Sequence, residues 1–212
     1  MTTPDSDRRP LATRQAGWAR RLAAALARSA ITPDQISLLS VFFAAVGAAL
    51  LAWWPTWLGL LDAAVCVQLR LLCNLLDGMV AVEGGKGSAV GKIWNEFPDR
   101  VADALLLVAL GFACGTPWLG WLAALLAVAT AYVRAFGGSL GMPQDFRGPL
   151  AKPQRMAVLT VACVFAAGSM LAARPGWAGW ALWLAAVVIA AGSALTCIRR
   201  TITIAAHLRR AA

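Results

Sequence analysis

Two short stretches of the chain carry polar side chains whose types and spacing suit divalent-cation chemistry. Asn74 and Asp77 lie three residues apart, so a helix places them on the same face. In the second stretch, four polar residues fall within about 100° of the helix surface, namely Asn95, Glu96, Asp99 and Asp103. Carboxylate and amide oxygens are hard ligands that suit Mg²⁺ or Mn²⁺. Interhelical hydrogen bonding is the plainer interpretation, but the one neighbouring arginine, Arg100, offers too few donors for it.

The composition requires these residues to be positioned by membrane-spanning helices. Of 212 residues, 60% are hydrophobic and 14% are charged, whereas a soluble domain has about 45–50% apolar and about 25% charged residues. Stretches that reach the span length of about 20 residues lie at 35–54, 57–81, 93–115, 118–138, 154–173 and 177–198. The chain is therefore expected to be an all-α integral membrane protein with six transmembrane helices. The five scattered cysteines and the single His207 exclude a zinc site.

The net charge of +9 is distributed asymmetrically along the chain. Six arginines precede the first span, further basic residues lie in the breaks at 82–92 and 139–152, and four arginines follow the last span. The opposite side carries Arg174 alone. The positive-inside rule therefore predicts a multi-pass protein of the cell (inner) membrane with both termini in the cytoplasm. The basic residues are expected to meet the lipid bilayer and not nucleic acid.

An interfacial amphipathic helix is expected before the first span, at residues 14–28. One face of this helix carries the apolar residues Trp18, Leu22, Ala25 and Leu26. Flanking arginines would attract the helix to anionic lipid. The expected organisation is a cytoplasmic N-terminus at 1–30, a six-helix membrane domain at 31–198 and a basic cytoplasmic tail at 199–212.

The second span contains a further carboxylate, Asp62. Carboxylates inside a span are costly and need a reason. Because Arg70 and Gln68 are nearby in sequence, Asp62 is interpreted as structural and not as catalytic.

The polar stretches and the segment between them resemble the signature of the CDP-alcohol phosphotransferase (CDP-alcohol phosphatidyltransferase) family. That family's pattern is D-x-x-D-G-x-x-A-R-(8 or 9)-G-x-x-x-D-x-x-x-D. With the spacing intact, this chain matches it at Asp77, Gly78, Ala81, Gly91 and Asp99. It departs at three positions, where Asn74 and Asn95 replace the first and third Asp and Val82 replaces the Arg. Six spans, a preceding interfacial helix and a Pro-x-x-Ile-Ser entry into the first span are also features of that family.

The resemblance implies transfer of a phosphatidyl group from CDP-diacylglycerol to an alcohol acceptor, with release of CMP. It also implies two Mg²⁺ or Mn²⁺ ions that hold the pyrophosphate, and a carboxylate that accepts the proton of the attacking hydroxyl. By position, the proton acceptor is Asp99, the metal ligands are Asn74, Asp77, Asn95 and Asp99, and the nucleotide contacts are Gly78, Ser88 and Gly91. Glu96 and Asp103 have no counterpart in the motif and are expected to join the metal site, restoring the charge that the two Asn residues lack.

Basic residues around the fourth and fifth spans are the candidates for binding an anionic head group or an acceptor phosphate. Pro153 is suited to begin the fifth span, which would place Lys152 and Arg155 at a positively polarised helix N-terminus. Arg134 lies near the end of the span before them.

Other functions compete with this hypothesis. The three departures from the motif favour a catalytically inactive family member or a small membrane transporter. Aspartate-rich prenyltransferases carry a similar motif, but they need a second one, and after Asp103 only Asp145 is acidic. The acceptor is left open among glycerol phosphate, inositol or its phosphate, serine and another lipid, and a second copy of the chain is a further candidate partner.

Overall fold

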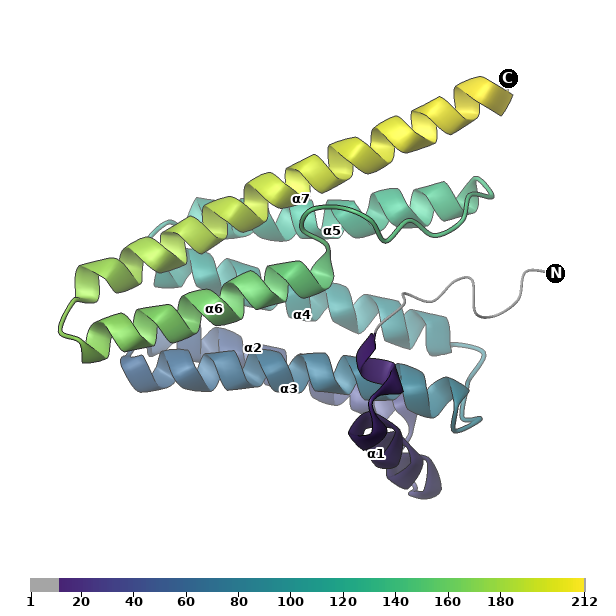
Figure 1. The fold of residues 1–212 in the computed structure, drawn as a ribbon, viewed down its shortest axis with the longest axis horizontal. Coiled ribbons are helices and arrows are strands. Elements are labelled where there is room, and N and C mark those ends of the chain that lie inside the picture. Colours follow the sequence, from purple (N-terminus) through teal and green to yellow (C-terminus); the bar gives the residue numbers. More distant parts are fainter. Residues whose placement is uncertain (1–11, 212) are drawn as a thin grey trace.

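A computed structural model of the protein describes residues 12–211, which fold into a bundle of helices (Figure 1). In chain order the elements are a 3₁₀ turn η1 (Ala12–Gln15), α1 (Gly17–Arg28), α2 (Pro33–Trp53), α3 (Trp57–Val82), α4 (Gly91–Ala113), α5 (Pro117–Ser139), α6 (Lys152–Leu171) and α7 (Pro175–Ala211). Five of them, α2, α3, α5, α6 and α7, are long and apolar enough to cross a membrane. The described chain is therefore an all-α membrane protein with a short helix before its first span.

Helix α4 differs from these five in composition. It has 23 residues, which is long enough to span. Its first half, however, carries five charged residues, Lys92, Glu96, Asp99, Arg100 and Asp103. These charges keep α4 out of the set of candidate spans, so five candidates stand where six were expected.

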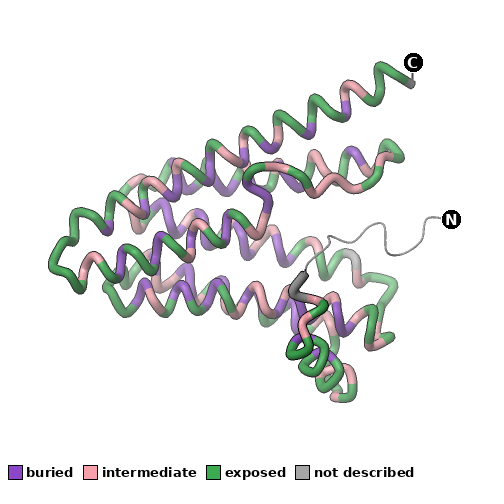
Figure 2. The backbone as a smooth tube through the Cα atoms, viewed as in Figure 1, coloured by how far each residue is buried: buried purple, intermediate pink, exposed green. Residues whose placement is uncertain are grey.

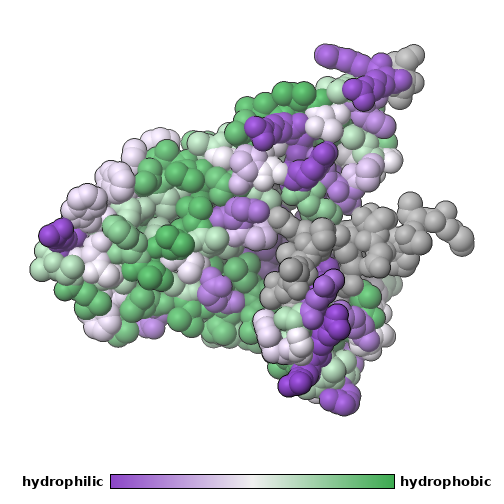
Figure 3. Space-filling model, viewed as in Figure 1, coloured by the Kyte–Doolittle hydropathy of each residue, from purple (hydrophilic) through white to green (hydrophobic). Residues whose placement is uncertain are grey.

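The two ends of the bundle differ in character. One end holds α1, the loops at 83–90 and 140–151 and the C-terminal end of α7, and we call it the basic end (Figure 1). Short turns at 54–56, 114–116 and 172–174 form the opposite end. In the space-filling view, the surface between the ends is mostly hydrophobic and hydrophilic side chains gather at the basic end (Figure 3).

Small residues allow the long helices to approach one another closely. Helix α2 packs against α3 and α4, α5 packs against α4 and α7, and α6 packs against α3 and α7. A Cβ atom added to Gly111 of α4 would lie 2.6 Å from the Cα atom of Gly120 of α5, so this crossing requires glycine. The buried interior is rich in alanine and follows the inner faces of the helices (Figure 2). Close packing of this kind holds helices together where lipid removes the hydrophobic driving force.

The N-terminus of α2 forms as its sequence indicates. Pro33 begins the helix, and Thr32 and Gln35 form a reciprocal capping box. The Thr32 hydroxyl accepts a hydrogen bond from the Gln35 backbone N–H at 3.3 Å, and the Gln35 side chain accepts one from the Thr32 N–H at 3.1 Å. Two otherwise unsatisfied donors are thereby paired, and the next turn is set to place Ser37 in the interior.

Helix α7 is longer than the sixth expected span. It continues without a break through 199–211, the segment expected as a basic tail. At 1.5 Å per residue its 37 residues extend about 55 Å, well beyond a hydrocarbon core of about 30 Å. Between Gly192 and Ala211 no Gly or Pro interrupts the helix, and Ile204 packs against Gly137 of α5.

Helix α1 divides its apolar residues between the bundle and the outside. Ala19 and Ala23 are buried in a cluster with residues of α2 and α3. Trp18 and Leu22, from the face expected to meet lipid, are 53% and 38% exposed. The helix is thus anchored by Ala19 and Ala23 with Leu26 packed beside them, while Trp18 and Leu22 face outwards, as an interfacial helix requires.

Candidate active site

The first motif carboxylate, Asp77, is buried near the end of α3 and only 3% exposed. Its Oδ2 atom accepts a hydrogen bond from the Ser37 hydroxyl at 2.7 Å, and Oδ1 accepts one from the Gly78 backbone N–H at 2.5 Å. Among the described side chains, no Lys, Arg or His makes an ion pair with Asp77. A buried carboxylate without a counter-ion is costly, so this position is suited to bind a cation.

The second motif carboxylate, Asp99 of α4, has the opposite surroundings. The Lys152 ammonium is in direct contact with its Oδ2 atom. Arg70 lies 3.4 Å from Oδ1, and Arg100 lies 3.7 Å from Oδ2. Three basic side chains of this chain therefore surround the negative charge of Asp99.

Asp103, one turn further along α4, is 1% exposed and lies between two buried arginines. Its Oδ1 atom is 2.6 Å from Arg70 of α3, and its Oδ2 atom is 3.0 Å from Arg155 of α6. Arg155 also donates to the Leu150 carbonyl at 3.0 Å and to the Thr130 hydroxyl at 3.3 Å. These ion pairs and hydrogen bonds form a network that joins α3, α4, α5 and α6 one helical turn along α4 from Asp99.

The neighbour expected for Asp62, Arg70, pairs elsewhere in the structure. Arg70 is fully buried and faces α4, where it contacts Asp99 and Asp103. Asp62 is exposed, and Gln68 donates a hydrogen bond to Thr160 of α6 at 2.8 Å. Proximity in sequence failed here because Arg70 lies on the inner face of α3 and Asp62 on the outer one.

Glu96 connects α4 to α5. Its Oε1 atom is 2.5 Å from the Arg134 guanidinium and 3.3 Å from that of Arg100, and its side chain is 45% exposed. Both additional carboxylates, Glu96 and Asp103, are thus engaged with arginines. Arg155, expected at an accessible helix N-terminus, lies in the interior with 1% exposure.

The remaining motif residues lie around the two carboxylates. Asn74 is partly buried one turn before Asp77, and its Nδ2 atom is buried without a hydrogen-bond partner. Asn95 is exposed on α4. Ser88 and Gly91 meet where α4 begins, with the Ser88 carbonyl accepting a hydrogen bond from the Gly91 N–H at 3.1 Å.

The donor set fits a divalent cation near Asp77 better than near Asp99. Within residues 12–211, no three His, Cys, Asp or Glu side chains form a metal-binding group, and Asn occupies two of the four motif positions. Amide and carboxylate oxygens are still hard ligands. Rotating the Asn74 amide would bring an oxygen to the position of its unpartnered nitrogen. Asn74 and Asp77 therefore offer two oxygen ligands and one uncompensated negative charge.

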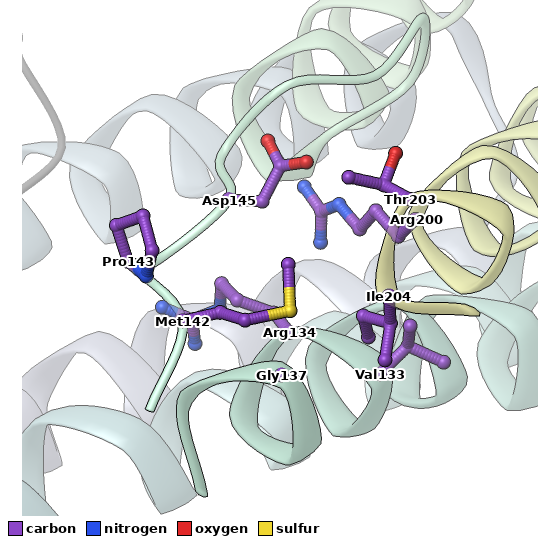
Figure 4. A pocket seen from close by; sticks show the side chains of 9 residues that line it. All are labelled: Val133, Arg134, Gly137, Met142, Pro143, Asp145, Arg200, Thr203 and Ile204. Carbon is purple, nitrogen blue, oxygen red and sulfur yellow. The ribbon is translucent and has the colours of Figure 1, made fainter. Parts of the chain in front are cut away.

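A small, open pocket lies beside the network at the basic end (Figure 4). It is lined by α5, the 140–151 loop and α7, and Arg134 and Arg200 are its basic residues. Arg200 is 6% exposed and donates to the Thr130 carbonyl at 2.8 Å and to the Arg147 carbonyl at 3.1 Å. No described residue accepts a hydrogen bond from its Nη2 atom. This guanidinium is held rigidly with a free donor.

Asp145 lies across the pocket from Arg200, and the two side chains turn towards one another (Figure 4). Partial burial raises the pKa of Asp145, but hydrogen bonds from Arg147 and the positive charges of Arg147 and Arg200 outweigh it and leave the pKa below its usual value. Asp145 is therefore ionised at neutral pH and keeps the pocket from being purely cationic.

Sequence reasoning placed none of Arg70, Ser37 and Arg200 in the candidate site. For Arg200 a signal exists, because Ser193, Thr196 and Arg200 follow one helical face and all three are buried. That periodicity indicates that the inner face of α7 continues past residue 198. For Arg70 and Ser37 the decisive fact is their partner on another helix, which a single sequence does not contain.

No family model matches the chain. A phosphatidylinositol phosphate synthase from Streptomyces avermitilis is 30% identical over 198 residues, covering 86% of this chain and 75% of that protein. The chain belongs to the CDP-alcohol phosphatidyltransferase family. Two solved structures of the Mycobacterium tuberculosis phosphatidylinositol phosphate synthase share the fold of this family member. The one with CDP-DAG bound has a TM-score of 0.70 at 22% identity and covers 89% of this chain and 94% of that one. The one in complex with manganese and citrate has a TM-score of 0.69 at 22% identity and covers 88% of each chain.

Proposed function

We propose that this chain transfers a phosphatidyl group from CDP-diacylglycerol to a phosphorylated alcohol and releases CMP. The observation that carries the proposal is the continuous ion-pair network at the basic end. It connects the motif carboxylate Asp99 to Lys152, Arg70 and, through Asp103, to Arg155. A site that combines carboxylates with several fixed cations suits a reaction between two anionic substrates. The phosphatidylinositol phosphate synthases among its relatives support the same reaction class.

The proposed topology has six spans, in which α4 joins the five candidate spans as the third in chain order. Its charged half would be shielded from lipid by ion pairs to α3, α5 and α6. The basic end would face the cytoplasm, as the positive-inside rule predicts. A reporter enzyme fused after Ala212 is expected to be active only on the cytoplasmic side of the inner membrane. Activity of this fusion on the outer side would contradict the topology and place the site in the wrong compartment.

Each part of the site has a role in this reaction. The acceptor hydroxyl oxygen attacks the phosphorus that carries the diacylglycerol, the bond to CMP breaks, and the hydroxyl proton passes to Asp99. By the motif, Asn74, Asp77, Asn95 and Asp99 are the candidate oxygen ligands of Mg²⁺ or Mn²⁺. The contact between Lys152 and Asp99 favours Asn74 and Asp77 among these four. A bound divalent cation supplies charge neutralisation for the pyrophosphate. Gly78, Ser88 and Gly91 would contact the nucleotide, where the absence of a side chain at the glycines permits close approach.

The acceptor is proposed to carry a phosphate because of the pocket beside the network. Arg134 and Arg200 line it, and Arg200 has a free guanidinium nitrogen. A guanidinium binds phosphate with short, charge-assisted hydrogen bonds. Inositol phosphate, one of the acceptors left open by the sequence, is of this chemical class, and the relatives' name, phosphatidylinositol phosphate synthase, supports it. Lys152 would contact the CDP-lipid side of the site, and Arg155 would position Asp103.

The test measures CMP release by purified protein from CDP-diacylglycerol, with inositol and inositol phosphate as acceptors. We expect release with the phosphorylated acceptor only. Arg200→Lys is expected to raise the KM for that acceptor about tenfold, because one charge-assisted hydrogen bond is lost, while the KM for CDP-diacylglycerol stays the same. The matched control is Arg199→Lys, since Arg199 is exposed beside Arg200 and does not line the pocket.

The second candidate, a catalytically inactive family member, is favoured by Asn74 and Asn95 and by the contact between Lys152 and Asp99. No CMP release with any acceptor, from protein that remains folded, would favour this candidate. Equal KM changes in the Arg199 and Arg200 variants would remove the pocket from the proposal and leave the reaction class standing.

A further inference from the structure

The charge of the site differs from that of a site built to hold two divalent cations. Four carboxylates and five basic side chains lie together, so positive charges exceed negative ones by one before any metal ion binds. The carboxylates are Asp77, Glu96, Asp99 and Asp103, and the basic residues are Arg70, Arg100, Arg134, Lys152 and Arg155. Two divalent ions would add four more positive charges to this partly buried cluster. At the low effective dielectric of such a region, their mutual repulsion would be strong.

The basic side chains are also distributed unevenly between the two motif carboxylates, Asp77 and Asp99. Asp99 has three basic side chains within 4 Å, whereas Asp77 forms no ion pair among the described side chains and feels the charge of Lys152 only from a greater distance. Asp77 is the more deeply buried of the two, with 3% exposure against 9%. A divalent cation would therefore gain most beside Asp77, with Asn74 one turn away as a second oxygen donor.

We propose that the Lys152 ammonium takes the place of a divalent cation at Asp99, so that this chain binds a single divalent cation, on the Asp77 side. The inference rests on the proposed function only in that the substrate is a pyrophosphate. An ammonium group supplies one fixed positive charge and three donors, so Lys152 can both neutralise Asp99 and donate to a phosphate oxygen. Asn95 removes the negative charge that a second divalent ion at this place would need.

The position of Lys152 makes this role specific. It is the first residue of α6, directly after the 140–151 loop, and its side chain is 20% exposed. The side chain is thus mostly shielded from solvent and lies at the edge of the site. Arg147, a basic residue of the same loop, is 83% exposed and pairs with Asp145 instead. Of these two basic side chains, only Lys152 lies beside a motif carboxylate, where it can replace a metal ion.

The experiment counts Mn²⁺ bound per chain, using the loss of the free-ion electron paramagnetic resonance signal on titration of the full chain in detergent. The wild type is expected to bind one Mn²⁺ and Asp77→Asn none. Asn95→Asp alone is expected to bind one, because Lys152 still occupies Asp99. Asn95→Asp combined with Lys152→Met is expected to bind two. Arg147→Met is the matched control and should bind one.

Two Mn²⁺ ions in the wild type, or in Asn95→Asp alone, would overturn the proposal. One ion retained in Asp77→Asn would overturn the assignment of the site. Gel filtration and thermal unfolding of each variant separate a lost site from a lost fold. Because the readout is metal stoichiometry and not CMP release, the proposal can fail while the transferase function stands, and the reverse also holds.

Discussion

Asp99→Asn is expected to lower CMP release by at least about 100-fold, the loss that follows removal of a positioned general base. An amide has nearly the shape of the carboxylate but cannot accept the proton of the attacking hydroxyl. The substitution also leaves the Lys152 ammonium without its anionic partner. Initial rates of CMP release at saturating concentrations of both substrates measure the effect.

Asp62→Asn is the matched control for Asp99→Asn. Asp62 is also a carboxylate within a long helix, but it is exposed on α3 and belongs to no ion pair of the described residues. Its substitution should leave the rate within about twofold, as for surface changes away from such networks. Activity of Asp99→Asn at the wild-type level would show that the proton goes elsewhere and that the role inferred from the motif does not apply to this chain.

Asp103→Asn is expected to destabilise the protein by about 3–5 kcal/mol, because it leaves two buried arginines without the charge that holds them. Arg70 and Arg155 are 0% and 1% exposed, and each pairs with one oxygen of Asp103. For a chain of this size, that cost corresponds to a decrease in Tm on the order of 10 °C. Thermal unfolding in detergent, followed by circular dichroism, measures it.

Asp145→Asn provides the comparison for Asp103→Asn. Asp145 forms an ion pair with Arg147 at 3.0 Å, but the Arg147 side chain is 83% exposed. Such a pair contributes up to about 1 kcal/mol, so the Tm should change little. Equal decreases in Tm for the two variants would show that the network stabilises the fold no more than a surface ion pair does. Asp103 would then again be a candidate metal ligand.

The fold was largely predictable because hydropathy and helix-start signals are local. Apolar stretches predicted the positions of the long helices to within a few residues, and Pro33 and Pro153 lie in the first turns of α2 and α6 as expected. One boundary was less predictable. The basic end of α7 continues a helix that composition alone would end at 198. There, contacts with neighbouring elements stabilise residues that look solvent-exposed in sequence, such as the buried Arg200.

For the candidate site, the sequence by itself determined the motif positions, the family and the oxygen-rich chemistry. The spacing of Asp77, Gly78, Gly91 and Asp99 is a local property of two helices and one loop. The tertiary structure decided which polar and charged side chains become partners. It brings Ser37 to Asp77, Arg70 and Arg155 to Asp103, and Lys152 to Asp99. The physical reason is that hydropathy specifies where a helix runs, whereas its rotation and its neighbours are set by the close packing of small residues such as Gly111 and Gly120.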